Sequence, residues 1–179
     1  MSSLPQFENI QINIDELPGI GSLELHPLES NYKYVRVIGW AVFALIVIVA
    51  ISVVLINVND PEAKKWLLMT AVPVLSLIVI ISFVFSYFGF FQMAYALRSK
   101  DIVFKKGLVY RKTTIIPFNR IQHCEVNHGP VDRLFNLASL KVFTAGGQTS
   151  DLEIPGLTEL RAQMIKDYII GKAGLDEEE

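Results

Sequence analysis

Two long stretches without a charged residue constrain this chain more than any other feature. The first runs from Val37 to Asn59, and its apolar part, 37–56, gives a helix of about 30 Å, which matches the hydrocarbon core of a bilayer. The second runs from Trp66 to Leu97 and is too long for one span, so we assign about 66–91 to a helix. We therefore predict two membrane-spanning helices.

The link between these helices is short and contains Asn59, Asp60 and Pro61, which favour a turn. So short a link makes the helices an antiparallel hairpin, with both chain ends on one side of the membrane. Two lysines lie in the link, whereas eight basic residues flank the spans on the other side. They are Lys33, Arg36, Arg98, Lys100, Lys105, Lys106, Arg111 and Lys112. The positive-inside rule therefore predicts that both termini are cytoplasmic.

Charge divides the chain into four regions. We expect an acidic N-terminal cytoplasmic segment at 1–30, the helical hairpin at 31–91, a cytoplasmic domain at 92–175 and an acidic tail at 176–179. Lys and Arg outnumber Asp and Glu in the cytoplasmic domain, although the chain as a whole has a net charge of −2. A basic domain beside a membrane is attracted to the anionic leaflet even without a specific pocket.

The spans and the histidines exclude several classes of function. Neither span contains an ionisable residue, which argues against a pump or ion pathway. Ser82 and Ser86 favour packing between the two helices of the hairpin. His123 and Cys124 are adjacent on an expected strand, so they point to opposite faces and do not predict a metal site. His128 is too far along the strand to join either of them as a ligand.

No catalytic or nucleotide-binding pattern is present. Gly146 and Gly147 lack the lysine and hydroxyl residue that complete a phosphate-binding loop, and they predict a turn instead. No serine lies in a nucleophile-elbow pattern. A basic stretch with an aromatic residue, Lys105 to Lys112 with Tyr110, faintly resembles a nucleic-acid-binding surface, but beside a membrane an anionic head group is the nearer anion. We therefore expect no enzymatic activity, no metal or other cofactor, and no nucleic-acid partner.

Alternating apolar residues and turn signals predict a strand-rich domain. We expect strands at 92–97, 102–105, 108–116, 121–127, 140–144 and 151–154, and a helical turn at 131–136. The last segment has apolar residues at helical spacing: Leu157, Leu160, Met164, Ile165, Tyr168 and Ile169. This pattern predicts a C-terminal helix with one buried stripe and Thr158 as its N-cap. The expected fold class is a membrane α-helical hairpin plus an α+β domain, a bent antiparallel sheet or half-barrel capped by that helix.

Residues 107–147, followed by the sequence DLEIPGL, resemble the bacterial pleckstrin-homology (PH)-like domain of membrane-flanked, YdbS-like proteins. The matching positions are Gly107, Pro117, Arg120, Ile121, Gln122, Gly129, Arg133, Leu134, Phe135, Leu137, Gly146, Ile154, Pro155, Gly156 and Leu157. Asn136 stands where the family usually has glycine, and because asparagine tolerates left-handed geometry we expect the turn to survive. The resemblance implies a PH-like fold behind a two-helix hairpin, in the bacterial inner membrane. It brings no enzymatic activity with it.

Two groups of polar residues are candidate contacts. Lys105, Lys106, Arg111 and Lys112 are candidates for binding anionic lipid head groups. Arg120, Gln122 and Arg133 match the family pattern and are candidate interaction residues, although the alternative that they stabilise turns between strands stays open.

We favour a non-enzymatic, membrane-anchored interaction or scaffold protein whose PH-like domain binds protein partners or itself. Its partners would be membrane lipids around the spans and either further copies of the chain or another membrane protein; the family implies a role in membrane stress or resistance. Two alternatives remain: an anionic-lipid-binding sensor, and an accessory subunit of a transporter or small channel. The N-terminal stretch containing Phe7, Ile10, Ile12 and Ile14 is either an added strand or docking segment, or a solvated acidic arm.

Overall fold

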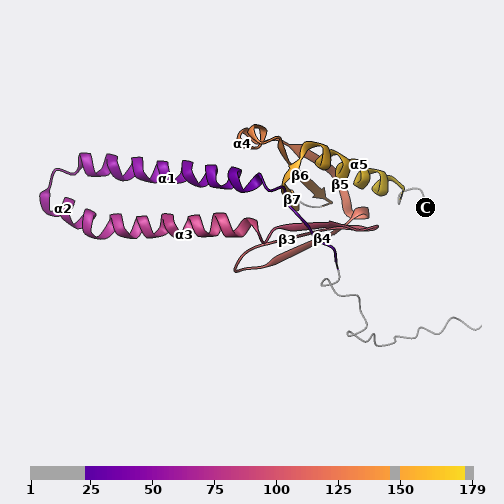
Figure 1. Ribbon diagram of the computed structural model, residues 1–179, viewed down its shortest axis with the longest axis horizontal. Coiled ribbons are helices and arrows are strands. Elements are labelled where there is room, and N and C mark those ends of the chain that lie inside the picture. Colours follow the sequence, from indigo (N-terminus) through magenta and orange to yellow (C-terminus); the bar gives the residue numbers. More distant parts are fainter. Residues whose placement is uncertain (1–22, 146–149, 176–179) are drawn as a thin grey trace, which may run out of the picture.

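The computed structural model describes residues 23–145 and 150–175. It consists of a long helical hairpin and a β-rich domain at the open end of that hairpin (Figure 1). Three sequence features fall outside the described residues: most of the turn expected at 145–148, the apolar N-terminal stretch at 7–14 and the acidic tail at 176–179.

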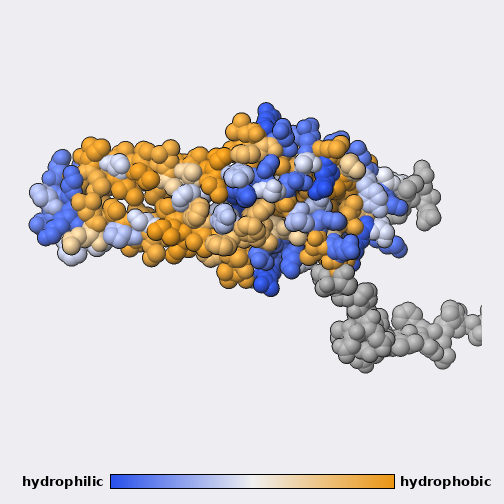
Figure 2. Space-filling model, viewed as in Figure 1, coloured by the Kyte–Doolittle hydropathy of each residue, from blue (hydrophilic) through white to orange (hydrophobic). Residues whose placement is uncertain are grey.

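The hairpin is built from two helices that are long and apolar enough to cross a membrane, Tyr32–Asn57 with 26 residues and Pro61–Phe90 with 30 residues. The first is α1 (Tyr32–Asn57). The second comprises α2 (Pro61–Trp66), the π-helical turn η3 (Leu67–Ala71) and α3 (Val72–Phe90). Figure 2 shows apolar surface along the length of the hairpin, bounded by hydrophilic residues at the α1–α2 link and at the domain. This arrangement fits two spans with polar surroundings at both ends.

Local chemistry explains where the second helix begins and why it contains a π turn. The Asp60 carboxylate accepts a hydrogen bond from the Glu62 N–H at 3.2 Å, and Pro61 occupies the first turn, where its missing N–H costs nothing. Pro73 has no N–H to offer the preceding turn and crowds its carbonyl. The Val72 N–H bonds to the Leu67 carbonyl, five residues back, which is the widened spacing of a π turn.

Polar contacts hold α1 against α3 in the half of the hairpin nearer the domain. The Trp40 indole N–H lies 3.1 Å from both the Val79 carbonyl and Ser82 Oγ. Ser86 Oγ donates to the Arg36 carbonyl at 3.3 Å. The prediction that the two serines pack against the other helix of the hairpin is confirmed.

The domain contains two antiparallel sheets. In spatial order the first holds β1 (His26–Pro27), β2 (Ala94–Leu97), β3 (Asp101–Lys106) and β4 (Lys112–Pro117). The second holds β5 (Ile121–Asn127), β6 (Leu137–Thr144) and β7 (Leu152–Thr158). The 3₁₀ turn η4 (Phe118–Arg120) joins the sheets, and α4 (Pro130–Leu134) connects β5 to β6. The C-terminal helix α5 (Glu159–Leu175) lies along the second sheet (Figure 1).

One apolar core lies between the sheets and α5. Its fully buried members come from both sheets and from the helix: Ile102, Phe104, Leu140, Val142, Ile154 and Ile169. The buried face of α5 consists of Ala162, Ile165 and Ile169, which follow helical spacing. The predicted fold class, a membrane hairpin followed by a bent antiparallel α+β domain capped by a C-terminal helix, is confirmed.

The structure corrects two details of the predicted elements. The strand expected at 108–116 begins only at Lys112, because Gly107 has a φ of 110° and turns the chain before it. The stripe expected on the last helix is partly wrong: Leu160, Met164 and Tyr168 are exposed. Leu157 is buried, but it belongs to β7, so it does not share the helical register that the pattern assumed.

Two local predictions are confirmed. Asn136 has a φ of 53°, so it adopts the left-handed geometry expected where relatives carry glycine. Thr158 precedes α5, and its Oγ1 accepts a hydrogen bond from the Arg161 N–H at 3.3 Å, as an N-cap does.

Candidate functional site

The four basic residues proposed for lipid contact lie on the β3–β4 hairpin. Lys106 and Lys112 are direct cross-strand partners, whereas Lys105 lies opposite Thr113, and Arg111 lies in the turn. Like charges placed directly opposite each other destabilise an antiparallel pair unless something neutralises them. The hairpin therefore concentrates positive charge at its turn end.

Gly107 shapes this turn. A Cβ at this position would lie 1.9 Å from the Tyr110 carbonyl oxygen, and the φ of 110° is one that side chains rarely allow. Because only glycine fits, the chain can reverse tightly and carry Val109 and Tyr110 at the tip. These two side chains are 79% and 86% exposed.

A hollow of about 300 Å³ lies where this hairpin meets the spans. The spans contribute Arg36, Phe85 and Gly89 to its lining, and the hairpin contributes Lys106, Leu108, Tyr110 and Lys112, among others. No acidic residue lines it. The structure therefore brings two of the four predicted basic residues together with Arg36, which had been considered only as a marker of membrane orientation.

Arg36 is held between the two spans. Its guanidinium donates toward the Phe85 carbonyl at 3.4 Å and the Met93 sulfur at 3.6 Å. A Cβ at position 89 would lie 3.2 Å from the Arg36 Nη2 atom, so Gly89 leaves room for the guanidinium against α3. Arg36 immediately precedes the apolar run that begins at Val37, which places it at the polar boundary of the span.

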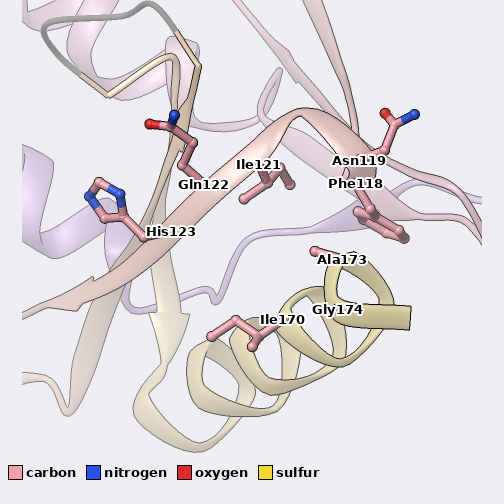
Figure 3. Close-up of a pocket in the computed structure, with 8 residues that line it drawn as sticks. All are labelled: Phe118, Asn119, Ile121, Gln122, His123, Ile170, Ala173 and Gly174. Atoms are coloured by element: carbon pink, nitrogen blue, oxygen red, sulfur yellow. The ribbon is translucent and has the colours of Figure 1, made fainter. Parts of the chain in front are cut away.

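The other predicted residues lie elsewhere and on different elements. Arg120 ends η4, Gln122 is on β5 and Arg133 is on α4, and all three are exposed. Within the described residues none of these side chains forms a hydrogen bond or ion pair. Gln122 borders a hollow of about 270 Å³ between β5 and the last turns of α5, but Figure 3 shows its amide pointing away from the helix. The structure thus does not assemble these three residues into one site.

The histidines and the cysteine have ordinary surroundings. His128 Nδ1 lies 3.1 Å from the Leu137 carbonyl oxygen, and the His123 ring stacks on Phe143 at 4.3 Å between ring centroids. Burial raises the pKa of the Cys124 thiol to about 11, and the nearby charge of Lys166 opposes the shift. In the described part of the chain, no group of three His, Cys, Asp or Glu side chains is placed to hold a metal ion.

A hollow of about 560 Å³ lies between α5 and the β1–β2 edge of the first sheet. We call it the α5–β2 groove; its lining includes His26, Tyr95, Leu97, Leu160, Arg161, Met164 and Tyr168. Leu160 and Met164 are 73% and 63% exposed, which is unusual for apolar residues that form a ridge at i, i+4 spacing. The helical pattern did single out these residues, but as core residues rather than as a surface.

Polar groups border the α5–β2 groove at one point. The Arg161 guanidinium donates to a Glu29 carboxylate oxygen at 2.9 Å. Burial raises the pKa of the Tyr95 hydroxyl, and the neighbouring Arg161 partly offsets that shift. Beside them, β1 pairs only with Ala94 and Tyr95, so the outer edge of β2 beyond Tyr95 has no strand partner within the described residues.

Comparison with known proteins gives one family and one relative. The family described as bacterial PH domain matches residues 33–173, which is most of the chain and includes both spans. The UPF0699 transmembrane protein YdbS of Bacillus subtilis (strain 168) is 31% identical over 75 residues. That match covers 42% of this chain and 45% of the relative, so this chain spans less than half of that protein. No solved structure matches.

Proposed function

The chain belongs to the bacterial PH domain family, and on that premise we propose that it is a non-enzymatic, membrane-anchored interaction protein that assembles with itself through its PH-like domain. Two apolar helices anchor it, and the excess of basic residues on the domain side supports a cytoplasmic domain with both termini inside. The observation that carries the proposal is the exposed apolar ridge of the α5–β2 groove beside a strand edge that has no partner among the residues described.

The groove has the properties of a peptide-binding surface. An apolar ridge of Leu160 and Met164 gains free energy when it is covered. The outer edge of β2 at Ala96 and Leu97 offers backbone groups to an incoming strand. A ligand that suits both features is an extended segment with apolar side chains on one face.

The N-terminal region of the chain contains such a segment. Ile10, Ile12 and Ile14 alternate with polar residues, as in a strand with one apolar face, and two acidic residues follow at 15–16. Arg161 lies at the groove, and a guanidinium has further N–H donors besides those that Glu29 takes up. We commit to residues 7–14 of a second copy as the occupant.

Confinement in a membrane favours exchange of this segment between copies. The spans hold every domain at the same height, and the segment is joined to β1, whose His26 lines the groove, by only eleven residues (15–25). Because the tether keeps the segment at the height of the grooves, confinement in one membrane also raises its effective concentration near the grooves of neighbouring copies. Neighbouring copies can therefore pair without a large affinity for the isolated segment.

The test is the oligomeric state of the full-length protein, measured by native mass spectrometry after mild extraction from its own membranes. We expect a discrete multimer, and we expect Met164→Glu to convert it to monomer. Gln163→Glu is the matched control, because it adds the same charge at the neighbouring exposed position of α5 and should leave the multimer intact.

Deletion of residues 2–14 separates exchange between copies from other modes of assembly. If the proposal is correct, the truncated chain is monomeric alone, but it still associates with a differently tagged full-length copy through its own intact groove. A monomeric wild-type protein, or a multimer that withstands both Met164→Glu and the deletion, would refute self-assembly through this groove.

A further inference from the structure

The tip of the β3–β4 hairpin combines apolar and basic side chains at the edge of the membrane. Val109 and Tyr110 are largely exposed, and both strands that lead to them carry lysine. From Ile102 to Cys124 the chain contains no acidic residue. Exposed apolar residues flanked by cations are typical of protein segments that lie in the head-group region of an anionic bilayer.

The position of the tip relative to the spans supports this interpretation. Figure 1 shows the β3–β4 hairpin reaching back beside the end of α3 that is nearest the domain. The hollow at this junction is lined by Leu108 and Tyr110 from the turn and by Phe85 and Gly89 from α3. Because Phe85 lies within a membrane-spanning helix, the turn reaches the level of the bilayer interface.

Three cations converge on the hollow without an acid to balance them. Lys106 and Lys112 lie opposite each other across the hairpin, and Arg36 faces them from α1. In the described part of the chain, none of the three forms a salt bridge. The repulsion between the two lysines would be relieved by an anion held between them. Apolar groups of Phe85 and Leu108 line the same hollow, so the anion that fits it best carries hydrocarbon.

We propose that this junction binds the phosphate of an anionic phospholipid, with Lys106, Lys112 and Arg36 around the phosphate. The lipid chains lie along α3 near Phe85, and Val109 and Tyr110 insert beside them. This site is distinct from the α5–β2 groove, and it requires no self-assembly. It would fix the distance and tilt of the domain relative to the leaflet, because the tip becomes a third membrane contact after the two spans.

Lipid binding can be counted on the full-length protein by native mass spectrometry in a neutral detergent. The probes are a phosphatidylglycerol and a phosphatidylcholine with identical chains, added at increasing concentration. We expect at least about tenfold tighter binding of the first phosphatidylglycerol, and we expect Lys106→Gln/Lys112→Gln to abolish that preference. Lys166→Gln/Lys172→Gln removes the same charge from α5 and should keep it.

A competition experiment with inorganic phosphate distinguishes binding of a lipid from binding of a free anion. If millimolar phosphate displaces phosphatidylglycerol completely, the site recognises phosphate alone and the lipid proposal fails. Equal binding of the two lipids by the wild-type protein, or equal loss of binding in both double variants, would also overturn it. Retention of phosphatidylglycerol in the presence of phosphate supports the proposal.

A second measurement tests the depth of the tip without changing any cation. Val109→Cys is exposed and can be labelled with an environment-sensitive dye near neutral pH, because Cys124 has a pKa of about 11 and is partly buried. In vesicles containing phosphatidylglycerol we expect blue-shifted emission that is quenched by lipids spin-labelled near the head group. The same dye at Gln163→Cys is the control. Indistinguishable spectra and quenching at the two positions would refute insertion of the tip.

Discussion

Replacing Gly156 by alanine is expected to destabilise the domain by about 2–5 kcal/mol. Gly156 has a φ of 64°, and a side chain in this left-handed region costs about 1–2 kcal/mol. The new Cβ would also lie 2.4 Å from Cγ and 2.6 Å from Cβ of Tyr32, and overpacking of this kind typically costs about 1–3 kcal/mol. Because the contact involves the root of the Tyr32 side chain, a rotation of the ring does not relieve it.

Cys124 provides the assay, since it is the single cysteine and lies partly buried in the domain. Brief pulses of a maleimide at increasing urea concentrations report the fraction of unfolded domain in the full-length protein. With a urea dependence of about 1–2 kcal/mol per molar, the midpoint should fall by about 1–5 M.

Gly171→Ala is the control for this experiment. A Cβ at that position meets nothing within 4 Å, and alanine favours a helix over glycine by about 1 kcal/mol, so its midpoint should stay constant or rise. A second comparison removes part of the steric clash: Tyr32→Ala deletes the Cγ contact but keeps Cβ, so it should make Gly156→Ala less costly in a double-mutant cycle. A midpoint for Gly156→Ala equal to that of the wild-type protein would refute the reasoning.

Two further predictions concern the domain. Because burial raises the Cys124 pKa from 9.0 to about 11, the alkylation rate of the folded protein should rise about tenfold per pH unit from pH 8 to 10, whereas the urea-unfolded chain should level off near pH 9. The folded state keeps this proton between pH 9 and 11 while the unfolded chain releases it, so the urea midpoint followed by circular dichroism should fall as the pH rises through that window; equal midpoints at pH 8.5 and 10.5 would contradict the assignment. Thr158→Ala removes the N-cap of α5 and should cost about 1 kcal/mol in urea unfolding, with Thr158→Ser retaining most of the stability, and equal losses in the two variants would argue against capping.

The membrane helices were the most predictable part of the fold because a long run of apolar residues without a charged side chain identifies them. The helices nevertheless extend beyond the apolar runs, since α1 begins at Tyr32 and the second helix begins at Pro61. Charged residues such as Arg36 and Lys64 are good helix formers, so a helix continues past the point where the hydrocarbon ends. Hydropathy therefore locates a span but not the ends of its helix.

The groove could not be predicted because a helical pattern does not identify which apolar ridge is buried. Met164 and Tyr168 precede Ile165 and Ile169 by one position each, which rotates them by about 100° around the helix. Both ridges are apolar, and only the packing of the second sheet against Ile165 and Ile169 decides which one is covered. When the apolar stripe of a helix is wider than the face that packs on a sheet, the excess apolar residues indicate a second, exposed apolar surface.

The hollow between the β3–β4 hairpin and the spans, here called the junction hollow, could not be predicted for a different reason: its cations are far apart in the sequence. Lys106 and Lys112 are close enough to be grouped by inspection, but Arg36 precedes them by 70 and 76 residues. The hairpin of membrane helices places Arg36 next to the domain. The tight turn at Gly107 places Lys106 and Lys112 near Arg36. Sequence alone shows basic residues near a membrane, and the fold is needed to make them converge.

The segment from His26 to Arg36 connects the two proposed sites. Its first residue lines the α5–β2 groove and its last residue lines the junction hollow. Between them, Glu29 pairs with Arg161 of α5, but both side chains are substantially exposed and such a pair contributes little stability. The segment is held to β7 mainly by the packing of Tyr32 on Gly156. A hydrogen bond from the Glu29 N–H to the Gly156 carbonyl at 3.0 Å adds to this contact. The packing of Tyr32 on Gly156 therefore couples the groove to the spans, in addition to the contact that we propose between the β3–β4 tip and the leaflet.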